Sequence, residues 1–428
     1  MTTTATAAID PRPAPPRAYR WIVLVMISLA MFGNYYVYDC VSPMADVLKA
    51  QLGYSDANIG LLQAIYSIPN IVMVLIGGFI IDRIGTRRAT LIFGVLCLAG
   101  AAVTAISGTL AVMAAGRLIF GLGAESLIFA VTTAIAKWFK GKELSFAFGI
   151  NLTIARLGSF AALNSPSWAG WAYDSWRMPL VISVAFCTFC VVGAVVYWVL
   201  ETRAERVYAL GQANQTDKVV FSDIFRFGWS YWFIVALCIT FYSGIFPFQT
   251  FAVKFFIEAH GVSRETGGFL SSMLTLFAMI CTPLFGLMVD KVGRRSLFMM
   301  CGSVLLIPVY LLMAYTQVSL YVPMAMMWIA FSLIPAIMWP SVAYVVEENK
   351  LGTAYGLMTL IQNVGLAGFN LVIGWANDYA GASAANPGGY TLGMWIFSCL
   401  GFFGLLFAWL LRRRESGPHA HGLETIKA

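Results

Sequence analysis

The chain has 428 residues, of which 60% are hydrophobic and 11% are charged, and its net charge is +7. Its mean hydropathy is +0.78. A soluble domain carries roughly 25% charged residues, so this composition excludes an ordinary soluble enzyme or binding domain. It predicts a polytopic helical membrane protein.

About twelve apolar stretches are long enough to cross a hydrocarbon core, which takes about 20 helical residues. Residues 1–19 are polar and rich in proline, and no small-residue cleavage site follows them, so we predict an uncleaved tail rather than a signal peptide. In chain order the predicted spans are 20–42, 57–81, 89–108, 111–136, 144–167, 177–200, 228–256, 266–289, 296–316, 319–345, 353–377 and 390–411.

The basic residues are distributed unevenly between the two sides of these spans. With the N-terminus placed inside, most of the 27 fall on the inner side; the exceptions are Lys49, Arg177, Lys254 and Arg264 outside and Arg117 and Arg156 within spans. The positive-inside rule therefore predicts that both termini are cytoplasmic. The excess of basic residues is then a topology signal and not a nucleic-acid footprint. We expect a multi-pass membrane protein, in the inner membrane if the chain is bacterial.

Two short loops carry the same pattern 208 residues apart, GFIIDRIGTRR at 78–88 and GLMVDKVGRRS at 286–296. A second echo, FAFGINLTIARLG at 146–158 and TAYGLMTLIQNVG at 353–365, has a shift of 207. Such duplication is typical of transporters whose substrate site lies near the midplane between the repeats. We predict an N-terminal tail, a six-helix half, a cytoplasmic linker, a second six-helix half and a C-terminal tail, at 1–19, 20–200, 201–227, 228–411 and 412–428.

The repeated loops are candidates for a cytoplasmic gate. Their carboxylates can cap a neighbouring helix N-terminus, and their basic residues can bridge to the other half when that side is shut. The alternative is that the loops only orient the chain, but orientation alone would not need the Asp and Gly. The gating candidates are Asp82, Arg83, Arg87, Arg88, Asp290, Lys291, Arg294 and Arg295.

Two charges fall at the centre of predicted spans. At 1.5 Å per helical residue, Glu125 lies about 21 Å from the start of its span and Arg156 about 18 Å from the start of the next. The two spans are sequential and antiparallel, so the charges reach similar depth on helices expected to be neighbours. A charge at this depth costs about 2.5–3.5 kcal/mol on insertion scales.

Two readings of this pair remain open. Glu125 and Arg156 form a structural ion pair inside the bundle, or they face a central cavity and bind opposite charges of a substrate. Arg156 corresponds in the repeat to Asn363, and Glu125 corresponds to Leu333, so the second half has no such pair. Because a scaffold feature would tend to recur, as Asp82 and Asp290 do, we favour substrate binding.

Other polar residues in the spans are weaker candidates. Arg117 is either part of the site or an anchor for a neighbouring loop. Asp39 and the tyrosines of YYVYD, with Tyr36 as the candidate, line a cavity or belong to an interfacial aromatic belt. From the second half the candidates are Trp339, Gln362, Asn363 and Asn370, although amides in membrane helices often serve as interhelical hydrogen bonds.

The repeated loops and GRLIFGLGAES (116–126) resemble the signatures of the major facilitator superfamily, whose fold is all-α with twelve transmembrane helices in two six-helix repeats. Within it, YYVYD (35–39), YSIPN (66–70), FGLGAESL (120–127), WFKGKEL (138–144), FAFG (146–149) and ARLGS (155–159) resemble the family of major facilitator superfamily domain-containing protein 1. That family consists of dipeptide carriers with a Glu and an Arg at the positions of Glu125 and Arg156. The resemblance implies capture of a peptide's amino and carboxylate ends.

We therefore predict a facilitative, alternating-access carrier (a uniporter) of dipeptides or similar small zwitterions, working in the lipid bilayer. The alternative is a proton-coupled symporter of small organic anions, with Arg156 holding the anion and Glu125 the proton. No H-E-x-x-H or G-x-S-x-G motif is present and no histidine falls within a span, so we predict no enzyme, metal or cofactor. The sequence predicts nothing about an accessory subunit.

Overall fold

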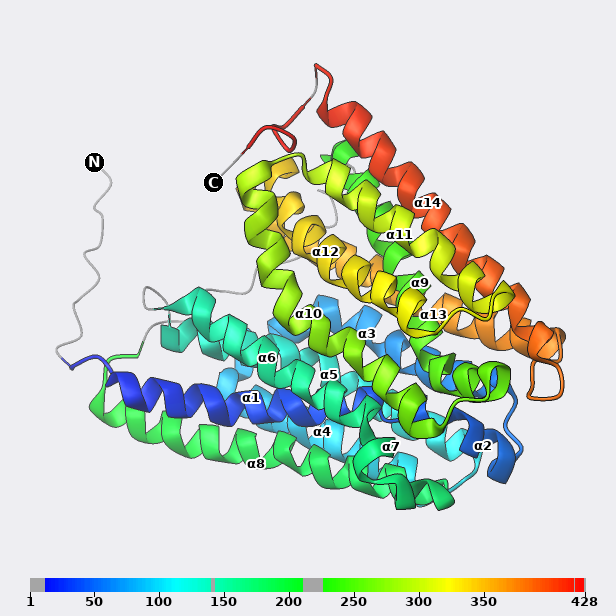
Figure 1. Ribbon diagram of the computed structural model, residues 1–428. Coiled ribbons are helices and arrows are strands. Elements are labelled where there is room, and N and C mark those ends of the chain that lie inside the picture. The colour runs from blue at the N-terminus through cyan, green and yellow to red at the C-terminus, as the bar shows by residue number, and fades with distance from the viewer. Residues whose placement is uncertain (1–11, 140–142, 211–225, 419, 427–428) are drawn as a thin grey trace.

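The computed structural model describes residues 12–139, 143–210, 226–418 and 420–426, which are almost entirely helical (Figure 1). The first half holds α1 (Arg17–Asp39), η1 (Ser42–Met44), α2 (Ala45–Leu52), α3 (Asp56–Ile84), α4 (Thr86–Ile106), α5 (Leu110–Phe139), α6 (Leu144–Leu163), α7 (Ser165–Trp168) and α8 (Arg177–Val207). The second half holds α9 (Trp229–His260), α10 (Arg264–Val292), α11 (Arg295–Tyr315), α12 (Tyr321–Val345), α13 (Leu351–Tyr379) and α14 (Thr391–Glu415).

Each half contributes six long helices. Among the described residues eleven segments are long and apolar enough to cross a membrane, and the bent α3 makes a twelfth when its two parts are counted as one span. The predicted all-α fold of two six-helix repeats is therefore confirmed. The repeat also extends to backbone geometry, because Gly85 and Gly293 end α3 and α10 with φ of 81° and 73°. Such positive φ angles favour glycine, which explains the glycine shared by the two loops.

The two halves meet along two symmetric helix pairs. Helix α3 packs on α13, and α6 packs on α10; in the repeat, α3 corresponds to α10 and α6 to α13. We call the side where α1 begins and α14 ends the terminal face, and the side of α2 and α7 the distal face. The halves converge at the distal face and diverge toward the terminal face (Figure 1).

The distal face is sealed by polar contacts between the halves. Lys254 of α9 and Asp56 of α3 are both fully buried, and the ammonium nitrogen lies 2.6 Å and 2.7 Å from the two carboxylate oxygens. The Asp378 carboxylate accepts hydrogen bonds from the backbone N–H groups of Asp56 and Ala57, both at 2.8 Å. Asp378 of one half thus caps the N-terminus of a helix in the other, where the helix dipole favours an anion.

A second ion pair completes what we call the distal seal. The Arg264 guanidinium, at the start of α10, contacts both carboxylate oxygens of Asp46 at 2.6 Å. Such bidentate pairs combine charge with fixed geometry. The distal seal therefore consists of Asp46–Arg264, Asp56–Lys254 and the Asp378 cap, and it holds the halves together on this side.

The seal also needs close backbone contact between α3 and α13. A Cβ atom added at Gly374 would overlap the backbone carbonyl oxygen of Asp56, and one added at Gly60 would overlap that of Asn370. Small residues allow helices in membranes to approach closely. These two glycines therefore set the distance at which the distal seal can form.

We predict that Gly374→Ala opens the distal face, because the added methyl group separates α13 from the start of α3. Hydrogen–deuterium exchange of the peptide that covers residues 56–60 should become faster. Gly368→Ala on the same helix is the matched control, since a Cβ there meets nothing within 4 Å. Equal exchange in the wild type and Gly374→Ala would contradict this role of the glycine.

Candidate functional site

A cavity of about 230 Å³ lies between the two halves at mid-depth. This volume is somewhat below the about 300–1,000 Å³ of drug-sized ligand sites, which suits a small molecule. The first half supplies every charged residue of the wall, and the second half supplies aromatic, amide, hydroxyl and aliphatic side chains. The wall is formed by Asn34, Tyr35, Tyr38, Asp39, Tyr66, Glu125, Ile128, Arg156 and Ser159 with Tyr242, Phe246, Gln249, Thr275, Phe331, Thr359, Gln362, Asn363 and Leu366.

Glu125 and Arg156 both lie on this wall, but they do not pair with each other. The Arg156 guanidinium carbon lies 5.6 Å from the ring centroid of Phe331, across the cavity on α12. Within the part of the chain that the structure describes, Glu125 forms no ion pair with Arg156 or any other cation. A structural ion pair is therefore absent from this state, and both charges are available to a ligand.

The polar face of α1 explains which tyrosines reach the cavity. Tyr35, Tyr38 and Asp39 line the wall, as expected for residues spaced i, i+3 and i+4 on a helix. The prediction that Tyr36 lines the site is wrong. Tyr36 points to the other side of α1 and stacks on Phe186 of α8, with ring centroids 4.3 Å apart. Spacing counted from Tyr35 selects Tyr38 and Asp39, whereas spacing counted from Asp39 selects Tyr35 and Tyr36, so the sequence alone does not decide between the tyrosines.

Of the candidates from the second half, Gln362 and Asn363 line the cavity. Trp339 lies behind the wall, where its indole N–H donates to the hydroxyl of Tyr242 at 2.9 Å; it can position Tyr242 but does not border the cavity. Asn370 does not border the cavity either. Its amide oxygen accepts from the Thr250 hydroxyl at 2.9 Å, in the packing of α9 against α13.

Arg117 anchors neighbouring helices, which is the structural one of the two roles considered from the sequence. It is 1% exposed, it does not border the cavity, and its guanidinium donates to the backbone carbonyls of Leu62, Val37 and Tyr38 at 3.3, 2.9 and 3.3 Å. It also bonds the Gln63 side chain. These bonds join α1, α3 and α5, because each buried N–H needs an acceptor.

The predicted gating residues lie at the terminal face, where the halves diverge. Arg83, Arg88, Lys291 and Arg294 are exposed. Two ion pairs there each join residues of the same half: Arg87 contacts Glu205 at 2.7 Å, and Asp290 contacts Arg295 at 2.8 Å. The chain end 420–426 packs on the second loop, because Glu424 accepts from the backbone N–H of Ser296 at 2.9 Å.

Sequence reasoning missed the distal seal and most of the second-half wall. Asp56 and Lys254 are 198 residues apart, and no local pattern connects them. Tyr242 and Phe331 look like ordinary core aromatics in their spans. Only the burial of a lysine and an aspartate inside an apolar bundle could have suggested that the two form a pair.

Comparison with known proteins identifies the family. The model of the Major Facilitator Superfamily matches residues 27–256 and 248–427. The lysosomal dipeptide transporter MFSD1 of Bos taurus is 33% identical over 377 residues, covering 85% of this chain and 81% of the relative. The Danio rerio protein of the same name is 34% identical over 380 residues, covering 85% and 82%. The chain belongs to the MFSD1 family of the major facilitator superfamily.

Solved structures support the same fold for this MFSD1-family chain. A bacterial homologue of the human lysosomal transporter Spinster superposes with a TM-score of 0.71 at 16% identity, covering 93% of this chain and 98% of that one. At this identity the likeness concerns the fold alone. The motif-based assignment is confirmed, and the protein is a multi-pass membrane transporter of small molecules.

Proposed function

We propose that this chain is a facilitative dipeptide carrier in which Glu125 binds the substrate's amino group and Arg156 its carboxylate. The observation that carries this proposal is the placement of the Glu125 carboxylate and the Arg156 guanidinium on the same cavity wall without an ion pair between them. The relatives named as dipeptide transporters support the substrate class.

A dipeptide matches the chemistry of this wall. It is a zwitterion whose end charges are separated by two residues, each spanning about 3.3–3.6 Å when extended. A carboxylate suits an ammonium, and a guanidinium fork suits a carboxylate. The second-half residues of the wall have no charge, so they can accommodate different peptide side chains. Recognition of the two ends would thus leave broad side-chain specificity.

The two ends can be tested separately with Ala-Ala, N-acetyl-Ala-Ala and Ala-Ala amide as competitors of dipeptide uptake in proteoliposomes. The wild type should prefer free Ala-Ala over either capped form by about 10- to 100-fold, as a hydrogen bond to a charged group contributes about 1.5–3 kcal/mol. Glu125→Gln should lose the preference over the N-acetyl form only. Arg156→Gln should lose the preference over the amide only.

Two further variants make this result specific. Glu347→Gln is the control, because its exposed carboxylate pairs with Lys350 away from the cavity. Asp39→Asn tests the other carboxylate of the wall. If Asp39→Asn, and not Glu125→Gln, removes the N-acetyl discrimination, the assignment of the ammonium site is wrong. Unchanged discrimination in both Glu125→Gln and Arg156→Gln would remove the proposed recognition altogether.

Facilitative transport is the second part of the proposal. In the same proteoliposomes, the initial rate of dipeptide uptake should stay the same when the pH gradient is collapsed, because no proton crosses with the peptide. A fall of this rate to that of protein-free liposomes would instead favour the alternative, a proton-coupled symporter of small organic anions. Competition by small carboxylates that lack an amino group would separate that alternative further.

Alternating access would require the two faces to open and close in turn. We place the terminal face, where α1 begins and α14 ends, on the cytoplasmic side, in line with its basic residues. In the present state the distal seal is formed. At the terminal face the Arg87–Glu205 and Asp290–Arg295 ion pairs each join residues of one half. For the terminal face to close, the basic residues of the repeated loops would exchange these partners for partners in the other half.

Asp82→Asn and Asp290→Asn test the proposed terminal gate. We expect both variants to bind dipeptide with unchanged affinity but to transport it at least several-fold more slowly, because the closed terminal face loses charged contacts. Binding is read by thermal shift with Ala-Ala and transport by uptake, with Glu347→Gln as the control for a lost surface carboxylate. Wild-type transport in both variants would show that the loops only orient the chain.

A further inference from the structure

A second site lies on the outside of the second half, at the terminal face. A groove of about 300 Å³ runs between the start of α9 and the end of α14. Its walls are Trp229 and Phe233 of α9, Leu410, Arg413 and Arg414 of α14, and residues 417–418. The groove does not touch the central cavity, since the two share no lining residue.

The groove lies at the height of the lipid headgroups. Helix α14 has 25 residues, so it is about 38 Å long, which exceeds the about 30 Å of the hydrocarbon core. Its final turn therefore emerges into the headgroup layer. Trp229 is 65% exposed at the first residue of α9, and such tryptophans mark the same interfacial layer.

The two arginines have no anionic partner among the described residues. Arg413 lies over the Trp409 ring, with its guanidinium carbon 5.8 Å from the centroid. The Nε of Arg414 is buried and has no hydrogen-bond partner in the described part of the chain. The neighbouring Glu415 does not neutralise them, because its carboxylate accepts from Ser230 at 2.5 Å and from the backbone N–H of His421 at 2.8 Å.

We propose that this groove binds the phosphate of an anionic phospholipid, with Arg413 and Arg414 holding the phosphate oxygens. Guanidinium groups bind phosphate in this bidentate way, and a phosphate would supply the missing acceptor for Nε of Arg414. Basic pockets between membrane helices bind anionic headgroups on the cytoplasmic side of membranes.

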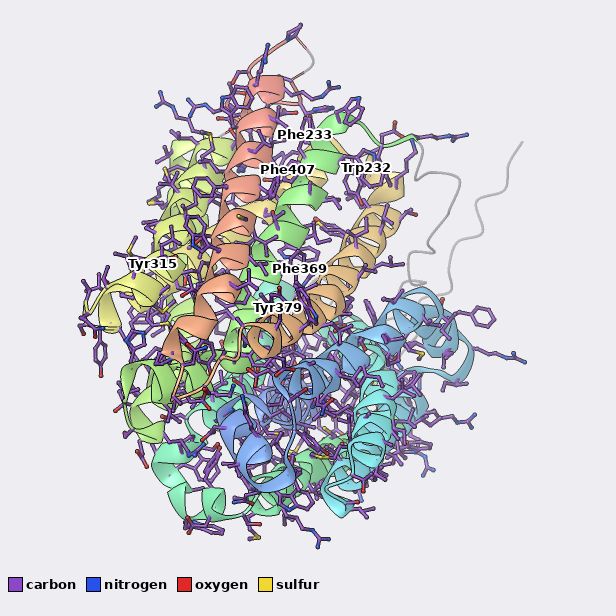
Figure 2. All side chains as sticks on the ribbon, turned by 90° about the vertical axis from the view of Figure 1, so that its right-hand side faces the viewer. Trp232, Phe233, Tyr315, Phe369, Tyr379 and Phe407 are labelled. Carbon is purple, nitrogen blue, oxygen red and sulfur yellow. The ribbon has the colours of Figure 1, made fainter. Side chains whose placement is uncertain are left out.

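The apolar part of the groove favours a lipid over free phosphate. The ring of Phe233 lies beside that of Trp229, with the centroids 6.1 Å apart and the ring planes at 32° to each other. Below them α14 presents Leu406 and Phe403 toward the bilayer, 43% and 52% exposed. Figure 2 looks onto this side of the half, with Phe233 on α9 and Phe407 on α14 labelled below the terminal face. Acyl chains can follow this surface from a headgroup held in the groove.

The test is a titration of the purified full-length protein with phosphatidylglycerol and with phosphatidylcholine, followed by native mass spectrometry and thermal shift. We expect bound phosphatidylglycerol and a larger rise in Tm than with phosphatidylcholine. At about 1 kcal/mol per arginine near an anionic surface, Arg413→Gln should weaken phosphatidylglycerol binding about 5-fold. The double variant with Arg414→Gln should weaken it about 30-fold.

Arg412→Gln is the matched control, because Arg412 belongs to the same arginine run but not to the groove wall. It should bind phosphatidylglycerol as the wild type does. Equal losses in Arg412→Gln and Arg413→Gln would show a diffuse basic surface and overturn the site. Equal binding of the two lipids would also overturn the site. A rise in Tm with inorganic phosphate equal to the rise with phosphatidylglycerol would do the same. Arg413 is exposed, so its single variant tests the proposal even if the double variant does not fold.

Discussion

The cost of a charge inside a bilayer is the constraint on which this structure depends. A charged side chain buried within the helix bundle must be paired, hydrogen-bonded or open to a water-filled space. The chain uses all three solutions. Arg117 is satisfied by backbone carbonyls of neighbouring helices, and Lys254 is paired with Asp56 across the halves. Glu125 and Arg156 face the cavity together with Asp39, and Glu125 and Arg156 do not pair with each other.

These three solutions separate three tasks. The Arg117 bonds hold one half together and do not need to break. The Asp56–Lys254 pair joins the two halves at the distal face, so it must break when that face opens. Removing one partner of a buried pair leaves an uncompensated charge, which costs about 3–5 kcal/mol. Opening therefore requires water or new partners to reach both groups, and this coupling makes the distal seal suited to a conformational switch.

Much of this could be predicted from the sequence, because it depends on local patterns. Apolar length gave the spans, the 208-residue shift gave the two repeats, and mid-span charges gave Glu125 and Arg156. The errors have physical causes. Tyr36 and Tyr35 are adjacent in sequence but about 100° apart around a helix. Asn370 lies on nearly the same face of α13 as Asn363 but about 10 Å further along the helix, where it bonds Thr250 of α9 instead of lining the cavity. Contacts such as Asp56–Lys254 depend on how the halves dock, which no single segment encodes.

The central claim is that Glu125 and Arg156 hold the two ends of one substrate. The most direct measurement is a cryo-electron microscopy structure of the protein with bound Ala-Ala. We expect density between the two side chains, with the peptide ammonium within hydrogen-bond distance of the Glu125 carboxylate and the peptide carboxylate on the Arg156 guanidinium. Peptide density that contacts neither side chain, or a direct Glu125–Arg156 ion pair beside the bound peptide, would contradict the claim.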